Sequence, residues 1–459
     1  MIPKILHFVY GLAEDFGGKP FTFFHWAAIR SAMAVHPGWR VMFWYAHLPD
    51  TPYFEDLADE MELMRIDAPE EIFGRPLLHV AHKADVVRLQ VLIEHGGVYM
   101  DVDTLTVRPF DDLLDNKFVM GIETADGKPV GLCNAIMMAE PRSMFALGWL
   151  KSYEAFRSKG RDEYWSEHSV KVPALLAERY PGEITILPNS AFFDPDWTRD
   201  GLKKMFYAVN AFPEARAHHL WEALAWNVLT HFNELNVDHV DNSYTVALRR
   251  LIGPDLERMR ARRRAWVEAE FAAGRARVNL GCGAKREPSF VNCDLYPEGG
   301  PDLVFDLEKG NWPIPESSVE TVWVHHVLEH VSGDPRVFFQ ELHRVTRDGA
   351  LTEIKVPHPR HDWFLMDPTH VKAWHGDSFA FLDKETCFDW LFAGDSKSPL
   401  ALYWDVDFRV ESVENRVADG AIRRTLSEAF GPGLVVEKAA AHLNNVVGEI
   451  CVRLRTRKS

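Results

Sequence analysis

Cysteine is scarce in this sequence: five residues are spread over 459 positions, and no two stand in the C-x-x-C spacing. Only Cys282 and Cys293 lie near each other, and the total is odd. This pattern gives no sign of a disulfide framework. We interpret the cysteines as free thiols and expect a cytoplasmic protein, because a reducing cytosol keeps thiols unpaired.

Long apolar runs are also missing. No window reaches the roughly 18 uncharged apolar residues that a membrane-spanning helix needs. The opening segment MIPKILHFVYG contains one lysine and an apolar run of a few residues, which is too short for a secretion signal. We expect this segment to form the first strand of the fold, and any membrane contact to be peripheral.

The chain has no excess of positive charge, since its formal net charge is −16 and its pI is about 5.7. Such a chain does not gather nucleic-acid phosphates as a whole, so we expect no nucleic-acid partner. One basic run holds five arginines between Arg258 and Arg264. A run of this kind can bind nucleic acid or anionic lipid, but we favour a solvated helical linker at residues 257–276.

The composition that is present, 47% hydrophobic and 26% charged, is ordinary for a packed globular protein. A length of 459 residues exceeds what one core usually organises, so we expect two domains, at 1–256 and 277–459. Short apolar strands alternate with helical patterns in both halves, which predicts the α/β class twice. The predicted strands are Ile5–Val9, Val41–Tyr45, Val98–Met100, Phe118–Ile122, Val278–Leu280, Val291–Cys293, Leu303–Phe305, Thr321–Val324 and Thr352–Val356.

The most informative segment begins at His82 and reads HKADVVRLQVLIEHGGVYMDVDTLTVRPFDDLL. It predicts a helix over Lys83–His95, a Gly-Gly break, and a strand that runs into an Asp-Val-Asp triplet at 101–103. Side chains alternate along extended backbone, so the two aspartates would point the same way and offer hard oxygen ligands to Mg2+ or Mn2+. A divalent cation there could neutralise the diphosphate that leaves a nucleotide-sugar donor. A solvated acidic loop is the alternative for so short a motif.

The whole run resembles the sugar-binding region of glycosyltransferase family 32. That family's pattern is a helix with Asp and Arg three residues apart, a Gly-Gly break, an aromatic residue and D-x-D. The matching residues, in chain order, are Asp85, Arg88, Gly96, Gly97, Tyr99, Asp101 and Asp103. The opening IPKILHFVYG and the segment GLCNAIMMAEP are similar to two further parts of the family. The resemblance covers Met1 to about Trp226 and implies a GT-A type fold and sugar transfer with retention of anomeric configuration.

The resemblance also implies roles for single residues. The implied donor-sugar-binding residues are Asp85, Arg88, Tyr99, Asp101 and Asn134. Asp85 would accept hydrogen bonds from sugar hydroxyls, and Arg88 would donate to sugar or phosphate oxygens. An ion pair between Asp85 and Arg88 on the helix surface is the alternative.

A third metal ligand is suggested by the segment ARAHHLWEALAWN, which resembles the family's closing His-aromatic segment. We prefer His219 to His218 because its H-x-W spacing fits better. A histidine packed beside tryptophans is the alternative. The predicted metal ligands are therefore Asp101, Asp103 and His219.

A second motif opens the C-terminal half. The sequence VNLGCG, starting at Val278, reads as a short strand running into a G-x-G turn, where backbone amides can approach a ligand closely. Asp294 ends the next strand, where a carboxylate can accept hydrogen bonds from both hydroxyls of a ribose. Asp306 ends the third strand in the same way. The spacing leaves no room for a full first helix, which disfavours a nicotinamide cofactor.

Together with WPIPESSVETVWVHHVLEHV and FFQELHRVTRDGALTEIKVPHP, this order resembles class I S-adenosylmethionine methyltransferases of the small-molecule type. The resemblance covers about Arg277 to Pro359. It implies a Rossmann-like domain that uses S-adenosyl-L-methionine. The implied cofactor-binding residues are Gly281, Gly283, Asp294 and Asp306.

Methylation of a hydroxyl gains from a base that removes its proton, and histidine suits that task. The candidates are His326, His330, His358, His361 and His370, of which we single out His330 and His361 as catalytic. Polar loop histidines are the alternative for each. Residues 326–330 also spell H-x-x-E-H, a zinc-protease pattern. We do not favour it, because the motif starts at a strand end and the run at 332–335 would stop a helix.

The sequence thus predicts a bifunctional enzyme. One half would transfer a sugar from a nucleotide-sugar donor to a glycan or glycolipid acceptor, and the other would methylate a hydroxyl on the same class of product. One alternative is a glycosyltransferase whose methyltransferase-like domain is not catalytic. Another is a glycan-binding protein with an inactive transferase site.

Overall fold

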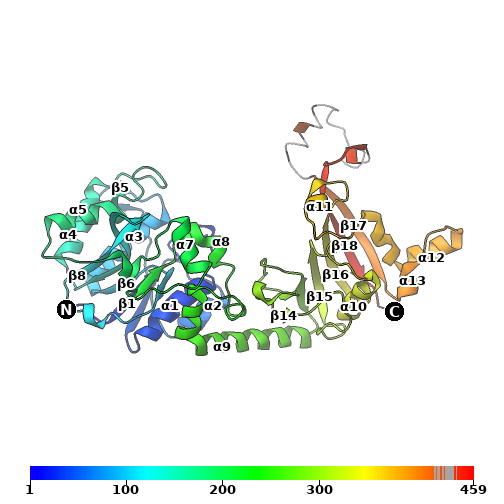
Figure 1. The fold of residues 1–459 in the computed structure, drawn as a ribbon, viewed down its shortest axis with the longest axis horizontal. Helices are drawn as coiled ribbons and strands as arrows, with labels where there is room; N and C mark the ends of the chain where they lie inside the picture. The colour runs from blue at the N-terminus through cyan, green and yellow to red at the C-terminus, as the bar shows by residue number, and fades with distance from the viewer. Residues whose placement is uncertain (418–419, 421–423, 426–427, 429–438, 441, 459) are drawn as a thin grey trace. The chain divides into compact units, whose positions relative to one another are not determined.

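The structure is a computed structural model that describes residues 1–417, 420, 424–425, 428, 439–440 and 442–458. The chain divides into two compact units, Met1–Glu257 and Arg258–Ser459, each built around a seven-stranded sheet (Figure 1). Among the described residues, no helix combines the length and the hydropathy needed to span a bilayer.

The first unit holds eleven strands. They are β1 (Ile5–Val9), β2 (Arg40–Tyr45), β3 (Glu62–Arg65), β4 (Glu71–Ile72), β5 (Arg75–Pro76), β6 (Gly97–Met100), β7 (Thr104–Thr106), β8 (Phe118–Ala125), β9 (Lys128–Ala139), β10 (Thr185–Leu187) and β11 (Ala217–His219). The main sheet has the order β10-β8-β9-β6-β1-β2-β3. β1 is parallel to both β2 and β6, and β9 is antiparallel to β6 and β8. β1 thus has a parallel neighbour on each side, so the strand order reverses at β1. In open α/β sheets, ligands bind beyond the carboxyl ends of the strands at such a point.

The helices of this unit are α1 (Phe23–Val35), α2 (Pro52–Ala58), α3 (Val80–His95), α4 (Met144–Ser152), α5 (Val172–Arg179), α6 (Asn189–Phe192), α7 (Arg199–Phe206) and α8 (Glu222–Leu229). Shorter helical turns are η1 (Phe16–Gly18), η2 (Asp111–Leu113), η3 (Tyr153–Ala155) and η4 (Glu167–Lys171). The long helix α9 (Ser243–Ala272) continues into the second unit and contains the basic run. Within that run, Arg263 binds the buried Asp302 at 2.7 Å.

The turn from α3 into β6 positions the first site. Gly96 has a φ of 65°, and a Cβ atom there would lie 2.6 Å from Pro141 Cδ. Only glycine fits both conditions. All four residues of β6 are buried, as expected for a central strand covered on both faces. The strand therefore delivers its carboxyl end, and the aspartates that follow, to a fixed place at the sheet edge.

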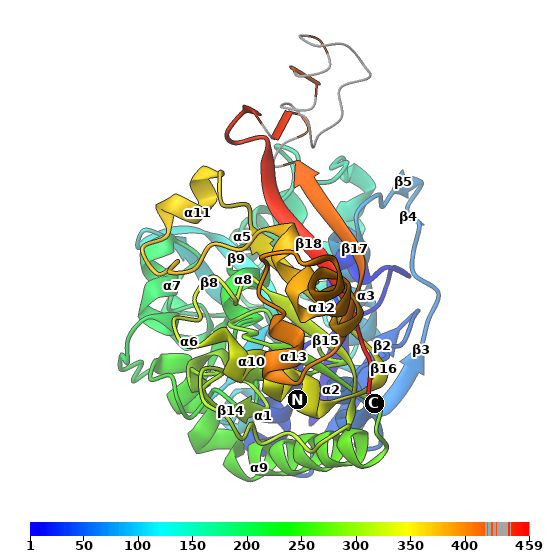
Figure 2. The same ribbon diagram turned by 90° about the vertical axis from the view of Figure 1, so that its right-hand side faces the viewer.

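The strands of the second unit are β12 (Ala276–Leu280), β13 (Val291–Asp294), β14 (Leu303–Val304), β15 (Val319–His325), β16 (Thr346–Pro357), β17 (Phe408–Val417) and β18 (Val447–Thr456). Its helices are α10 (Pro335–Val345), α11 (Asp362–Met366), α12 (Lys384–Ala393) and α13 (Leu400–Trp404), with the turns η5 (Pro297–Gly299) and η6 (Gly376–Leu382). The sheet order is β14-β13-β12-β15-β16-β18-β17. The strands from β14 to β16 are parallel, and β18 is antiparallel to β16 and β17. Figure 2 shows β17 and β18 at the end of this sheet.

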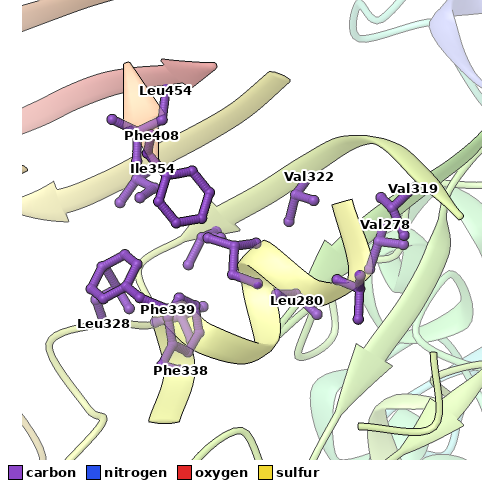
Figure 3. Close-up of a cluster of buried hydrophobic side chains, with 14 of the residues drawn as sticks. Val278, Leu280, Val319, Val322, Leu328, Phe338, Phe339, Ile354, Phe408 and Leu454 are labelled. Atoms are coloured by element: carbon purple, nitrogen blue, oxygen red, sulfur yellow. The ribbon is translucent and has the colours of Figure 1, made fainter. Parts of the chain in front are cut away.

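Aliphatic residues of the parallel strands and aromatic residues of α10 form the core of this unit (Figure 3). Val278, Val322 and Ile354 come from neighbouring strands, and Phe338 and Phe339 of α10 pack against them. All five are at most 1% exposed. The predicted α/β class, with a GT-A type and a Rossmann-like half, is confirmed. Each predicted strand is present, with ends that differ by up to six residues. The predicted domain limits stay a prediction.

Candidate functional sites

Asp101 and Asp103 lie in a turn directly after β6, not in the extended backbone that we predicted. The argument from strand alternation is therefore wrong. The turn nevertheless brings the two carboxylates together with His219. One ligand atom from each residue lies within 4.8 Å of the other two. His219 reaches this place because β11 pairs with β7, which puts His219 opposite Thr104.

Asp103 and His219 form a buried, charge-matched pair. Asp103 Oδ2 lies 3.3 Å from His219 Nε2 and accepts a 2.8 Å hydrogen bond from the Glu222 amide at the start of α8. Burial raises the pKa of Asp103, but His219 and this hydrogen bond outweigh burial and hold the pKa below its usual value. Burial lowers the pKa of His219, but Asp103 outweighs it and the pKa lies above the usual value. A cation at this place would compete with the proton of the imidazole.

Asp101 is held by Tyr99 and Arg88. The Tyr99 hydroxyl donates a 2.5 Å hydrogen bond to Asp101 Oδ1, and Arg88 Nη2 lies 3.2 Å from the same oxygen. Burial raises the pKa of Asp101, and although Arg88 lowers it, Asp103 raises it again, so the pKa lies above its usual value. The repulsion between the two neighbouring carboxylates is thus not fully offset at Asp101, and a divalent cation would offset it further.

Behind this turn, Asp85, Arg88 and Asn134 form a buried network. Asn134 Nδ2 donates a 2.7 Å hydrogen bond to Asp85 Oδ1, and Arg88 Nη1 donates to the Asn134 carbonyl at 2.9 Å. Arg88 Nη2 lies 3.4 Å from Asp85 Oδ1. All three residues are less than 10% exposed. The pair of Asp85 and Arg88 is thus not a surface ion pair, and it lies beside the aspartate turn.

The residues of the turn fit a divalent cation. Two carboxylates and one imidazole are a donor set that Mn2+ accepts, and the carboxylates also suit Mg2+. His219 Nδ1 is buried without a hydrogen-bond partner among the described residues. When bound, the cation would neutralise charge on a leaving diphosphate. Sequence reasoning missed Glu123 of β8. This residue is 9% exposed and interacts electrostatically with His219, and its burial raises its pKa.

The second site lies after β12. Gly281 and Gly283 have φ angles of 64° and 51°. A Cβ on Gly281 would lie 2.5 Å from Val327 Cγ2, whereas a Cβ on Gly283 would meet no described atom within 4 Å. The Gly283 amide donates a 2.7 Å hydrogen bond to Asp294 Oδ2, and the Tyr296 amide donates to the other oxygen at 3.0 Å. The glycine turn and the carboxylate are therefore fixed together, with open space in front of Gly283.

The remaining predicted residues of this half lie in turns. Asp306 accepts a 2.9 Å hydrogen bond from the Glu308 amide, which closes a local turn after β14. His361 caps α11, because its Nδ1 accepts a 3.0 Å hydrogen bond from the Trp363 amide. Burial lowers the pKa of His361, so the ring is neutral near pH 7. With the Nδ1 lone pair engaged, the proton sits on Nε2, which disfavours this histidine as a base.

His330 is exposed and lies in the turn that follows β15. Its Nδ1 lies 2.9 Å from Thr369 Oγ1, and its ring centroid is 4.7 Å from that of His370. The H-x-x-E-H segment is not helical, as expected, and His326 adopts a φ of 56°. A zinc-protease helix is therefore absent from this segment, which the structure describes in full.

Comparison with known proteins matches both halves of the chain. Residues 25–119 match the family described as glycosyltransferase sugar-binding region containing DXD motif, and residues 291–353 match the methyltransferase domain family. The chain is 36% identical over 266 residues to glucan organizing enzyme 1 of Cryptococcus neoformans var. grubii serotype A, a match that covers 55% of this chain and 72% of that relative.

Two further similarities are weaker. The chain is 30% identical over 166 residues to mannosyl phosphorylinositol ceramide synthase SUR1 of Saccharomyces cerevisiae, covering 36% of this chain and 37% of that relative. A solved structure of a SAM dependent methyltransferase from Archaeoglobus fulgidus is 18% identical, with a TM-score of 0.27, and the match covers 44% of this chain and 94% of that one. The double resemblance predicted from the sequence is confirmed by the family matches. The chain is an enzyme that belongs to the glycosyltransferase family with the DXD-containing sugar-binding region, and it carries a methyltransferase domain in its C-terminal half.

Proposed function

We propose that the first unit transfers a sugar, with retention of anomeric configuration, from a nucleotide-sugar donor to a glycan or glycolipid acceptor. Asp101, Asp103 and His219 would hold Mn2+ or Mg2+ for this reaction. The observation that carries the proposal is the convergence of their three ligand atoms within 4.8 Å at the edge of a GT-A type sheet. The name of the yeast relative, mannosyl phosphorylinositol ceramide synthase, joins a mannosyl group to a sphingolipid head group, which supports a glycolipid acceptor.

The buried network behind the metal turn would bind the donor sugar. The Asp85 carboxylate can accept further hydrogen bonds besides the one from Asn134, so it would accept hydrogen bonds from hydroxyls of the sugar. Arg88 faces both Asp85 and Asp101, and it would fix the two carboxylates while presenting positive charge to the donor. Tyr99 would act through Asp101, to which its hydroxyl donates.

The second unit would bind S-adenosyl-L-methionine in the turn after β12 and methylate a sugar hydroxyl. The open space at Gly283 and the hydrogen bond between its amide and Asp294 support this placement. S-adenosylmethionine supplies a methyl group activated by its sulfonium. His330, whose ring is exposed, is the better placed of the two predicted bases. The five cysteines are all free and buried, which supports the cytoplasmic location that we propose.

Calorimetric titration of nucleotide sugars in the presence of Mn2+ tests the first activity. Wild type should bind one member of the panel, and Asp103→Asn should lose at least tenfold in affinity because the cation loses an oxygen ligand. Asp200→Asn is the matched control, since this aspartate is exposed on α7. Binding that withstands both Asp103→Asn and a chelator would remove the metal assignment. A wild type that binds glycan but no nucleotide sugar would favour the glycan-binding alternative.

Titration of S-adenosylmethionine tests the second activity. Gly283→Trp should block binding, because it fills the open space at the turn. Gly349→Trp is the matched control: Gly349 has a positive φ of 72° and equally open surroundings, and it lies in β16. Equal affinity in both variants would contradict the placement. A wild type without affinity for S-adenosylmethionine would leave a glycosyltransferase with a non-catalytic second domain.

A further inference from the structure

Glu329, His330 and His370 form a second cluster of metal-ligand atoms, in the second unit. One ligand atom from each residue lies within 4.8 Å of the other two. The first two residues stand in the turn after β15, at the carboxyl edge of the sheet, and the third follows 40 residues later. The two segments are tied by the backbone, because the amides of Val371 and Lys372 donate to the Glu329 carbonyl at 2.8 and 3.2 Å.

The Glu329 carboxylate is buried and only partly compensated. Its side chain is 1% exposed, and neither oxygen accepts a hydrogen bond from any described residue. Its ion-pair partner is His326, whose Nδ1 lies 3.4 Å from Glu329 Oε1. The other nitrogen of that ring is 2.9 Å from Glu449, so two carboxylates share this positive charge. Burying a carboxylate costs several kcal/mol unless charge or hydrogen bonds compensate it. A cation bound beside Glu329 would provide that compensation.

Both histidines are oriented as metal ligands are. His370 Nδ1 lies 2.9 Å from the Phe364 carbonyl, which can only accept, so this nitrogen carries the proton and Nε2 keeps its lone pair. Thr369 Oγ1 donates its proton to Asp367 at 2.6 Å and therefore accepts from His330 Nδ1. Each imidazole thus has an unprotonated Nε2 that can bind a metal ion, while its Nδ1–H donates a hydrogen bond to an oxygen acceptor. His370 Nε2 also lies 3.8 Å from Asp367 Oδ2.

The surroundings leave room for a further ligand. An open surface depression of about 430 Å³ includes His370 and is lined by Trp363, Met366, Asp367 and Pro368. Trp363 is 50% exposed and Met366 is 76% exposed, so this wall offers apolar surface beside the polar cluster. Zinc sites with three protein ligands and one open position are typically catalytic, and two histidines with one glutamate are a known set of this kind.

We infer that Glu329, His330 and His370 bind a divalent transition-metal ion, with Zn2+ as the best match to the donor set, and that the open position takes a hydroxyl oxygen of the methyl acceptor. The second part rests on the proposed methyl transfer. Metal binding lowers the pKa of a coordinated hydroxyl, so the acceptor oxygen would lose its proton more readily. His330 would then act as a metal ligand in place of the base considered above. In the balanced step, the acceptor oxygen bonds to the methyl carbon, the sulfur–methyl bond breaks to give S-adenosylhomocysteine, and the hydroxyl proton passes to solvent.

Zinc content measured on the full chain tests the site apart from any activity. Protein freed of metal by a chelator is dialysed against Zn2+ and analysed for bound metal, in an Asp103→Asn background that removes the first cluster. This background should bind about one Zn2+ per chain. His330→Ala and His370→Ala should each lose it, whereas His375→Ala, an exposed histidine of the same segment, should retain it.

Glu329→Gln separates a ligand from a carboxylate that is merely buried. The variant should also lose Zn2+, and because its side chain is isosteric, circular dichroism can show that the fold persists. Equal zinc content in the His330, His370 and His375 variants would overturn the site, as would full zinc binding by folded Glu329→Gln. The assay contains neither methyl donor nor acceptor. Failure of the proposed methyl transfer would therefore leave zinc binding intact, and loss of zinc binding would leave S-adenosylmethionine binding intact.

Discussion

Two adjacent histidines in β11 have different environments, and only one faces the aspartate turn. His218 Nδ1 lies 2.6 Å from the Asp194 carbonyl, and burial lowers the pKa of His218 to about 4. His219 instead lies against Asp103. We predict that His219→Gln weakens Mn2+ binding by about 10- to 100-fold, because the cation loses its nitrogen ligand. Mn2+ titration followed by electron paramagnetic resonance measures this. His218→Gln is the control, and a larger loss of Mn2+ affinity in that variant would reverse the assignment.

His7 in β1 predicts a pH dependence of stability. It is fully buried, Trp44 Nε1 donates to its Nδ1 at 3.1 Å, and its Nε2 lies 2.7 Å from the Gly96 carbonyl. Burial lowers the pKa of His7 from 6.5 to about 4. A second proton on the ring would also displace the hydrogen bond that Nδ1 accepts from Trp44. The unfolded chain takes up this proton near pH 6.5 and the folded chain does not. Stability should therefore be complete above that pH and fall by about 2 kcal/mol between about pH 7 and about pH 5.

Urea unfolding of the full chain, followed by tryptophan fluorescence, measures the free energy of unfolding at both pH values. His7→Gln keeps a donor and an acceptor but does not titrate, so it should lose this part of the pH dependence even if it is less stable at neutral pH. Parallel pH profiles for wild type and His7→Gln would show that the proton enters His7 without cost.

At the scale of elements, the link between α3 and β6 tolerates substitution poorly. Gly96→Ala would combine a positive φ with a Cβ only 2.8 Å from the Pro141 backbone nitrogen. We predict a loss of about 3 kcal/mol in the free energy of unfolding. Gly38→Ala, with a φ of 79° and open surroundings, should cost only about 1 kcal/mol. Denaturant unfolding of both variants makes the comparison. Equal losses would mean that backbone strain, not the contact with Pro141, decides the effect.

The elements themselves were readable from sequence, because apolar periodicity and glycine breaks act locally. The helix before the Gly-Gly break and the strand after it are present as α3 and β6. The predicted extended conformation of the D-x-D triplet was wrong. A turn and a strand end differ in their backbone hydrogen bonds, and the three residues of the triplet do not determine those bonds. Glu222 and Glu123 could not be found either, because they reach the turn from α8 and β8 through the fold and not through any spacing in the motif. His370 joins Glu329 and His330 through backbone and side-chain contacts between two segments that are distant in the sequence.

For the whole molecule, the two sites draw on separate parts of the chain, and so each ligand should leave its own footprint. The core of β6 and α3 and the core of β12 to β16 contain no residue in common. Ligand binding stabilises the residues that hold the ligand, and at about 100-fold excess over Kd the gain is about 2.7 kcal/mol, or roughly 100-fold slower amide exchange. Hydrogen exchange read by mass spectrometry should therefore show two footprints.

A nucleotide sugar with Mn2+ should protect peptides over residues 97–106 and 217–225, which contain the aspartate turn, β11 and the start of α8. S-adenosylmethionine should protect peptides over 278–296, which contain the glycine turn and Asp294. Gly283→Trp should erase the second footprint and keep the first, because the substitution touches only the turn after β12. If S-adenosylmethionine protected the aspartate turn instead, the assignment of one cofactor to each half would be wrong, whatever the activities of the chain.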